Sequence, residues 1–96
     1  GIATLLEVAR AFAEAPRRPR RTIAFAAVTA EEKGLLGSDY LARHPLPRGL
    51  VPVANVNLDM PILIHDFTDI IAYGADQSTL GATVGRAIRG LGIALT

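Results

Sequence analysis

The chain has 96 residues, a length that fits one small domain or a piece of a larger one. Half of the residues are hydrophobic and the formal net charge is +1 at pH 7, a balance that indicates neither a nucleic-acid partner nor a membrane-surface partner. The absence of cysteine excludes disulfides and thiolate metal sites, and no apolar run approaches the roughly 18–20 residues that insert into a membrane as a helix.

The first half of the chain predicts two helices and one buried strand. Apolar residues recur at helical spacing over residues 2–15. The arginine-rich residues 17–21 follow, and we interpret them as a solvated connection because no aromatic side chains are interleaved and the net charge is near zero. Residues 22–29 are almost continuously apolar, as in a strand covered on both faces. A second helix is predicted around residues 37–43, with His44 as a surface or C-terminal capping residue.

The second half predicts further strands and one more helix. Residues 53–58 and 69–73 are strand-like, and residues 80–91 carry one apolar stripe at helical spacing. A further strand opens at residues 93–95. Helices that alternate with buried strands predict the α/β class, with a mainly parallel (mixed) central sheet flanked by helices.

Three carboxylates end two of these predicted strands. Glu31 and Glu32 follow the first strand, and Asp59 follows the second. Ligands of such sheets bind beyond the carboxyl ends of the strands, so the three acids are expected to meet in one crevice if the strands are neighbours. Because acids at close range repel one another, a divalent cation is the simplest compensation, and zinc accepts carboxylate oxygens.

Simpler interpretations stay open for these side chains. Taken alone, paired glutamates also suit a solvated helix N-terminus, and an aspartate after a strand is often a turn or capping residue. A second group, His65 with Asp66 and Asp69, could be a metal cluster, although a polar loop between strands explains it as well.

Two motifs together resemble a known family. Residues 30–38 read AEEKGLLGS and residues 57–60 read NLDM. In this order they resemble the di-zinc aminopeptidase family of zinc exopeptidases, which includes bacterial leucyl aminopeptidase and aminopeptidase Y. Residues 1–10 are similar to the family's helix after its bridging aspartate, and residues 21–25 to the strand that leads into its paired glutamates. The resemblance therefore covers about the first two-thirds of the chain.

The resemblance implies a role for each acid. Glu31 would be the general base that activates the metal-bound water, Glu32 a ligand of one zinc ion, and Asp59 a ligand of the other. Two zinc ions are expected in the complete domain, with a peptide as substrate. The family also uses an upstream His-x-Asp, a bridging aspartate and a distant histidine. None has a matching position here, so the sequence predicts an internal piece of one catalytic domain, residues 1–96, truncated at both ends.

Fold and activity follow from the same resemblance as expectations. The family has a three-layer α/β/α, phosphorylase/hydrolase-like architecture, and its members are often exported to the periplasm or secreted. An aminopeptidase is the leading prediction for the activity. A glutaminyl-cyclase-like acyltransferase on the same scaffold, and a non-catalytic domain that has lost the metal site, are the alternatives.

Overall fold

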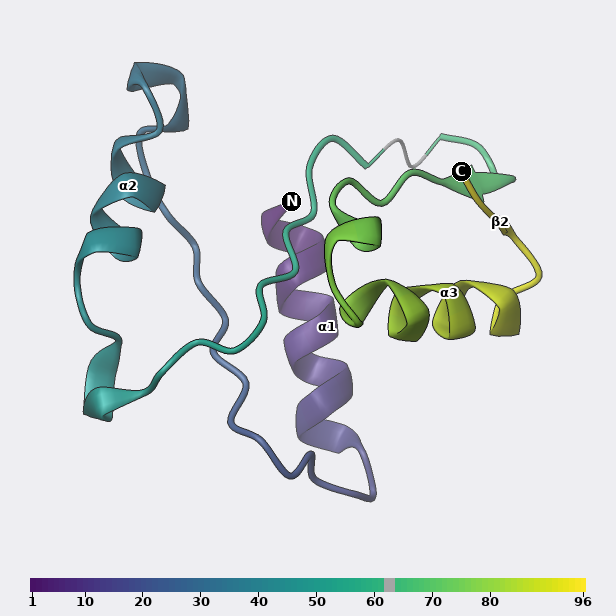
Figure 1. The fold of residues 1–96 in the computed structure, drawn as a ribbon, viewed down its shortest axis with the longest axis horizontal. Coiled ribbons are helices and arrows are strands. Elements are labelled where there is room, and N and C mark those ends of the chain that lie inside the picture. The colour runs from purple at the N-terminus through teal and green to yellow at the C-terminus, as the bar shows by residue number, and fades with distance from the viewer. Residues whose placement is uncertain (62–63) are drawn as a thin grey trace. The chain divides into compact units, whose positions relative to one another are not determined.

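The computed structural model describes residues 1–61 and 64–96 (Figure 1). The chain forms two compact units, Gly1–Met60 and Pro61–Thr96, and each is described on its own. No helix in the described part of the chain is long and apolar enough to cross a membrane. The organisation of residues 1–96 as part of a single catalytic domain stays a prediction.

The first unit begins with helix α1, Ile2–Glu14, which confirms the predicted helix to within one residue. The helix ends because Pro16 disfavours helical geometry in the residue before it, and Ala15 is accordingly extended, with φ −60° and ψ 137°. The apolar face of α1 meets the segment that follows, since the ring centroids of Phe12 and Phe25 lie 6.1 Å apart. This aromatic contact holds the helix against the start of the predicted first strand.

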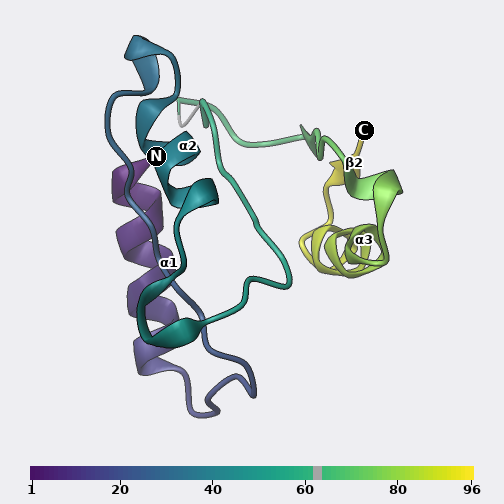
Figure 2. The same cartoon turned by 60° about the vertical axis from the view of Figure 1, so that its left-hand side comes forward.

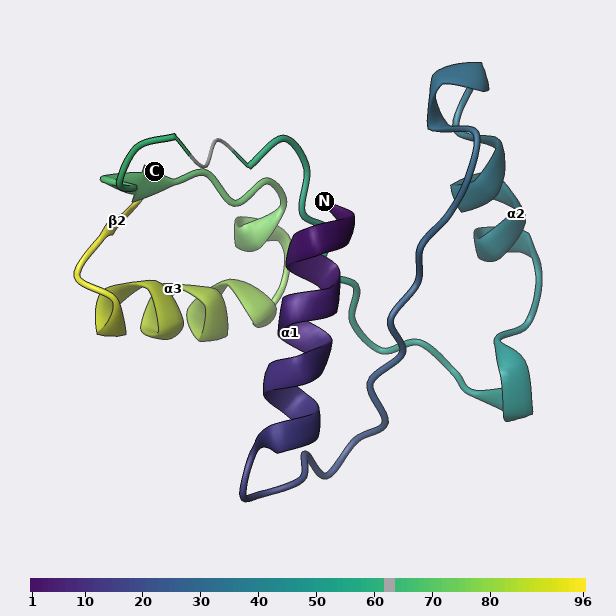
Figure 3. The ribbon, with the colours of Figure 1, turned by 180° about the vertical axis from the view of Figure 1, so that it is seen from behind.

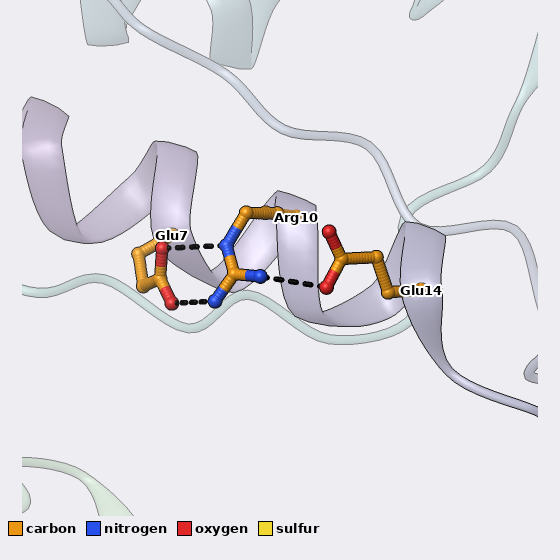
Figure 4. Close-up of polar contacts among 3 residues, drawn as sticks. All are labelled: Glu7, Arg10 and Glu14. Atoms are coloured by element: carbon orange, nitrogen blue, oxygen red, sulfur yellow. Dashed lines mark hydrogen bonds and ion pairs between the residues drawn. The ribbon is translucent and has the colours of Figure 1, made fainter.

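The exposed face of α1 carries a three-residue ion-pair cluster (Figure 4). Arg10 lies between Glu7 and Glu14, and its Nη1 is 2.6 Å from a carboxylate oxygen of Glu14. The hydrogen bond from Arg10 lowers the pKa of Glu7 below its ordinary value, because it favours the charged carboxylate. Exposed pairs of this kind support a helix only weakly, so the cluster adds little to the stability of the unit.

The strands predicted at residues 22–29 and 53–58 do not form in this structure. Both segments run as open chain without strand pairing in the described part of the molecule (Figure 3). A helix satisfies its own backbone hydrogen bonds, whereas a strand needs a neighbouring strand to accept and donate them. The predicted segments are therefore present as apolar, exposed chain, with Val53 and Val56 at 70% and 79% exposure.

Helix α2, Leu36–Arg43, confirms the second predicted helix. His44 is its C-terminal capping residue, as predicted: its Nδ1–H donates to the backbone carbonyl of Tyr40 at 2.7 Å, and the two rings stack with centroids 3.7 Å apart. An Arg43–Asp39 ion pair of 2.8 Å lies on the same helix. A 3₁₀ turn, Pro47–Gly49, leads away from it.

The second unit is a small β-α-β arrangement (Figure 1, Figure 2). Strand β1, Asp69–Ile70, pairs in parallel with β2, Ala94–Leu95, and helix α3, Leu80–Gly90, lies between them in sequence after a short 3₁₀ turn at Ala75–Gln77. Parallel strands need such a crossover, and its presence is typical of the α/β class. The predicted strand at 69–73 is thus shorter than expected, since it pairs only where β2 reaches it.

Side-chain packing in this unit centres on α3. Ile88 is 5% exposed and is the buried apolar side chain of the described residues. At the start of α3, the backbone N–H of Leu80 donates to Ser78 Oγ at 3.2 Å. Thr96 Oγ1 donates to a carboxylate oxygen of Asp69 at 2.9 Å. This bond links the residue after β2 to the first residue of β1. The described fold therefore agrees with an α/β class and contains a two-stranded parallel sheet.

Candidate active site

The paired glutamates occupy a one-turn 3₁₀ helix, Glu31–Lys33. Left-handed residues close both of its ends: Ala30 precedes it with φ 58°, and Gly34 follows it with φ 98°. Glycine adopts this conformation without steric cost, which explains Gly34, whereas alanine does so rarely. The turn is short and sharply bounded, and it directs two adjacent carboxylates outward from the end of the first apolar segment.

Five backbone hydrogen bonds hold this turn together. The carbonyl of Glu31 accepts from Gly34 at 3.1 Å and from Leu35 at 2.9 Å. The carbonyl of Ala30 accepts from the N–H groups of residues 33 and 36, at 3.2 and 3.3 Å. The N–H of Gly37 donates to the carbonyl of Thr29 at 3.0 Å, which ties the first turn of α2 back to the end of the apolar segment. Gly34 and Gly37 both take part in these hydrogen bonds and permit the tight turn that carries the glutamates.

Backbone strain is concentrated beside the predicted site residues. Four non-glycine residues of the described chain have positive φ, and three of them flank the acids: Ala30, Leu35 and Met60, at 58°, 60° and 43°. Met60 directly follows Asp59. Strained residues of this kind cluster at functional sites, where the surrounding structure holds them in place. Nothing in the sequence predicted this conformation for alanine, leucine or methionine, since only glycine or asparagine would have signalled it.

The three carboxylates themselves are exposed and separate. Glu31, Glu32 and Asp59 all face solvent, and the ion pairs of the described residues lie elsewhere, on α1 and α2. Within residues 1–61 and 64–96, no three His, Cys, Asp or Glu side chains come together as a group that could hold a metal ion. The predicted convergence of the three acids depended on two strands pairing in one sheet, and those strands are unpaired here. Their roles stay predictions.

The donors fit zinc in kind but not in number. Glu32 and Asp59 offer carboxylate oxygens, which zinc accepts, whereas catalytic zinc sites use three protein ligands for each ion. His65 and Asp66 lie outside any metal-binding group among the described residues, and the neighbouring Asp69 accepts the hydrogen bond from Thr96. Any zinc centre would therefore need ligands beyond those that the described residues assemble.

The sequence profile of peptidase family M28 matches residues 1–95. The chain belongs to peptidase family M28. The resemblance to a zinc-peptidase family drawn from residues 30–38 and 57–60 is thereby confirmed.

Several relatives of this M28 chain share one name. A protein of Pyrenophora tritici-repentis named "probable zinc metalloprotease" is 43% identical over 60 residues, which are 62% of this chain and 13% of that protein. A protein of the same name from Pyrenophora teres f. teres is 43% identical over 60 residues, 62% of this chain and 12% of that protein. The one from Pyricularia oryzae is 51% identical over 43 residues, 45% of this chain and 8% of that protein. No solved structure matches the chain significantly. The matched part of the chain thus spans only between 8 and 13% of the length of these relatives.

Proposed function

We propose that the whole protein is a zinc-dependent exopeptidase, and specifically an aminopeptidase that hydrolyses N-terminal peptide bonds. The observation that carries the proposal is the Glu31–Lys33 turn, which presents two exposed carboxylates between left-handed residues in a chain of peptidase family M28. Adjacent acids on a tightly hydrogen-bonded turn suit two different tasks, because one can contact a metal while its neighbour stays free to exchange a proton.

In this proposal the acids divide the chemistry of peptide hydrolysis. Glu31 removes a proton from the attacking water as its oxygen bonds to the scissile carbonyl carbon, and then delivers that proton to the departing amine as the C–N bond breaks. Glu32 and Asp59 would each hold one of two zinc ions. Bound zinc supplies Lewis-acid polarisation of the carbonyl and lowers the pKa of water.

The remaining parts of the site lie outside the described residues in this proposal. The other ligands, and the further strands that would pair with residues 22–29 and 53–58, belong to a three-layer α/β/α domain with a mainly parallel sheet. Unpaired apolar segments at 22–29 and 53–58 support this arrangement, because each has the composition of a strand with neighbours on both sides. The substrate is a peptide with a free amino terminus.

Hydrolysis of matched peptides by the whole protein tests the proposal. We expect a peptide with a free amino terminus to be cleaved at its first bond and the same peptide with an acetylated amino terminus to resist. A chelator should abolish cleavage and added zinc should restore it. Equal cleavage of both peptides would contradict the aminopeptidase assignment. Cyclisation of an N-terminal glutamine without hydrolysis would indicate an acyltransferase instead, and no activity of either kind would indicate a non-catalytic domain.

A further inference from the structure

The turn that carries Glu31 and Glu32 is held by a close approach between two backbone segments. Gly37, in the first turn of α2, lies against Thr29, the last residue of the apolar segment 22–29. A Cβ atom on Gly37 would lie 2.6 Å from the backbone nitrogen of Thr29 and closer still to its carbonyl oxygen. Both of these are main-chain atoms, so no side-chain rotation can make room. Glycine is the residue that fits here without moving the backbone.

This contact is linked to the glutamates through a short series of hydrogen bonds. Gly37 donates to Thr29, and Ser38 Oγ donates to the carbonyl of Leu35 at 3.0 Å. Leu35 in turn donates to the carbonyl of Glu31 at 2.9 Å. Because all of these partners lie within residues 29–38, a displacement of α2 relative to Thr29 changes the path of the turn between them.

We propose that Gly37 is a positioning residue, whose close contact with the Thr29 backbone fixes the direction in which Glu31 and Glu32 point. The inference rests on the proposed peptidase function and adds a residue that touches neither metal nor substrate. A Cβ atom at position 37 forces the two segments apart by several tenths of an ångström. A misplacement of about 1 Å at a catalytic group can cost about 100-fold in rate.

The test compares two glycine-to-alanine variants of the whole protein. Gly37→Ala adds a methyl group at the contact, whereas Gly90→Ala adds the same group at the end of α3, where, apart from neighbouring residues and the helix backbone, no described atom lies within 4 Å of the new Cβ. Peptide hydrolysis is measured with kcat expressed per zinc-loaded chain, together with KM and zinc affinity. We expect Gly37→Ala to lower kcat by about 10- to 100-fold with KM changed less than threefold, and to weaken zinc binding, while Gly90→Ala matches the unsubstituted protein.

Normalising kcat to zinc-loaded chain separates positioning from folding. A purely structural role would reduce the amount of folded protein and leave kcat per zinc-loaded chain unchanged, and that result would overturn the proposal. If Gly37→Ala cannot be purified, Ser38→Ala removes the hydrogen bond to Leu35 without adding atoms, and should lower kcat several-fold. Ser38→Thr keeps the hydroxyl and should therefore keep kcat near that of the unsubstituted protein. Equal kcat in Ser38→Ala and Ser38→Thr would then overturn the proposal.

Failure of the proposed peptidase function and failure of the Gly37 positioning role would give different results. An unsubstituted protein that binds zinc but hydrolyses no peptide would refute the proposed function, while the zinc affinities of Gly37→Ala and Gly90→Ala would still decide whether Gly37 positions the acids. An active unsubstituted protein with an equally active Gly37→Ala variant would refute the positioning role alone. Absence of both zinc binding and activity would refute both.

Discussion

Expressed by itself, the 96-residue chain should not fold cooperatively. The reason lies in how little of it is buried. Residues 1–60 contain no buried residue, and the buried residues among those described in 61–96 are Gly85 and Ile88. Many large apolar side chains face solvent, among them Val51 at 80% and Tyr73 at 94% exposure. A chain that leaves its apolar residues in water gains little to offset the conformational entropy that folding costs.

The burial of apolar surface that this chain lacks can be worked out from its accessible surface. The structure leaves 8880 Å² exposed, whereas a compact protein of 10.1 kDa leaves about 5300 Å². If about half of the difference is apolar, the missing burial corresponds to about 45 kcal/mol at roughly 25 cal/mol per Å². An ordinary interface between Gly1–Met60 and Pro61–Thr96 would bury about 1500 Å² at most and could not close this gap. Stable domains have a margin of only about 5–15 kcal/mol.

Urea titration of the isolated chain, followed by circular dichroism and by amide NMR, measures the outcome. We expect a gradual loss of helix signal, narrow amide dispersion and binding of a hydrophobic dye. The apolar segments 22–29 and 53–58 should also cause association as concentration rises, because unpaired strands recruit one another. A monomer with dispersed amide signals and a single cooperative transition, with a slope of about 1 kcal/mol per M urea, would refute the reasoning.

Two further predictions concern the helices of the whole protein. Gly81→Ala should destabilise the protein by about 1–3 kcal/mol, because the new Cβ would lie 2.7 Å from the carbonyl carbon of Ala75. Gly90→Ala, at an open position, should be neutral or stabilise the protein by up to about 1 kcal/mol. Equal urea midpoints for the two variants would contradict the close approach of Gly81 to Ala75. Arg10 lowers the pKa of Glu7, so their pair supports α1 above the usual glutamate range and is lost as pH falls through the lowered pKa. Arg10→Ala should therefore raise the pKa of Glu7 in an NMR titration, and an unchanged value would show that the pair does not form in solution.

Helices were predicted from the sequence more accurately than strands, for a physical reason. The hydrogen bonds of α1 and α2 lie within about four residues of one another, so a local apolar pattern with a proline or histidine at the end was enough to place them. Residues 22–29 have an equally clear strand composition, yet they remain unpaired because the pattern does not supply a partner. The short β1 and β2 strands did form, where a crossover helix brings two segments together.

The same difference between local and long-range contacts applies to the candidate site. Glu31 and Glu32 were located from a local motif, and the turn that carries them is held by hydrogen bonds within residues 29–37. The approach of Asp59 to this turn depends on neighbouring strands, so it could be predicted only as a consequence of a sheet. Left-handed Ala30 and Leu35 were not predicted, because their conformation is imposed by the hydrogen bonds around them rather than by their own preferences.

Zinc content and turnover of the Glu31→Gln whole protein test the central claim most directly. Glutamine keeps the size of the side chain but cannot accept the proton, so zinc content should match that of the unsubstituted protein while kcat falls by about 10²- to 10⁴-fold. The neighbouring Glu32→Gln variant serves as the control, because it should lose zinc and activity together. Full turnover in Glu31→Gln, or loss of zinc from it, would contradict the division of roles between the two adjacent glutamates.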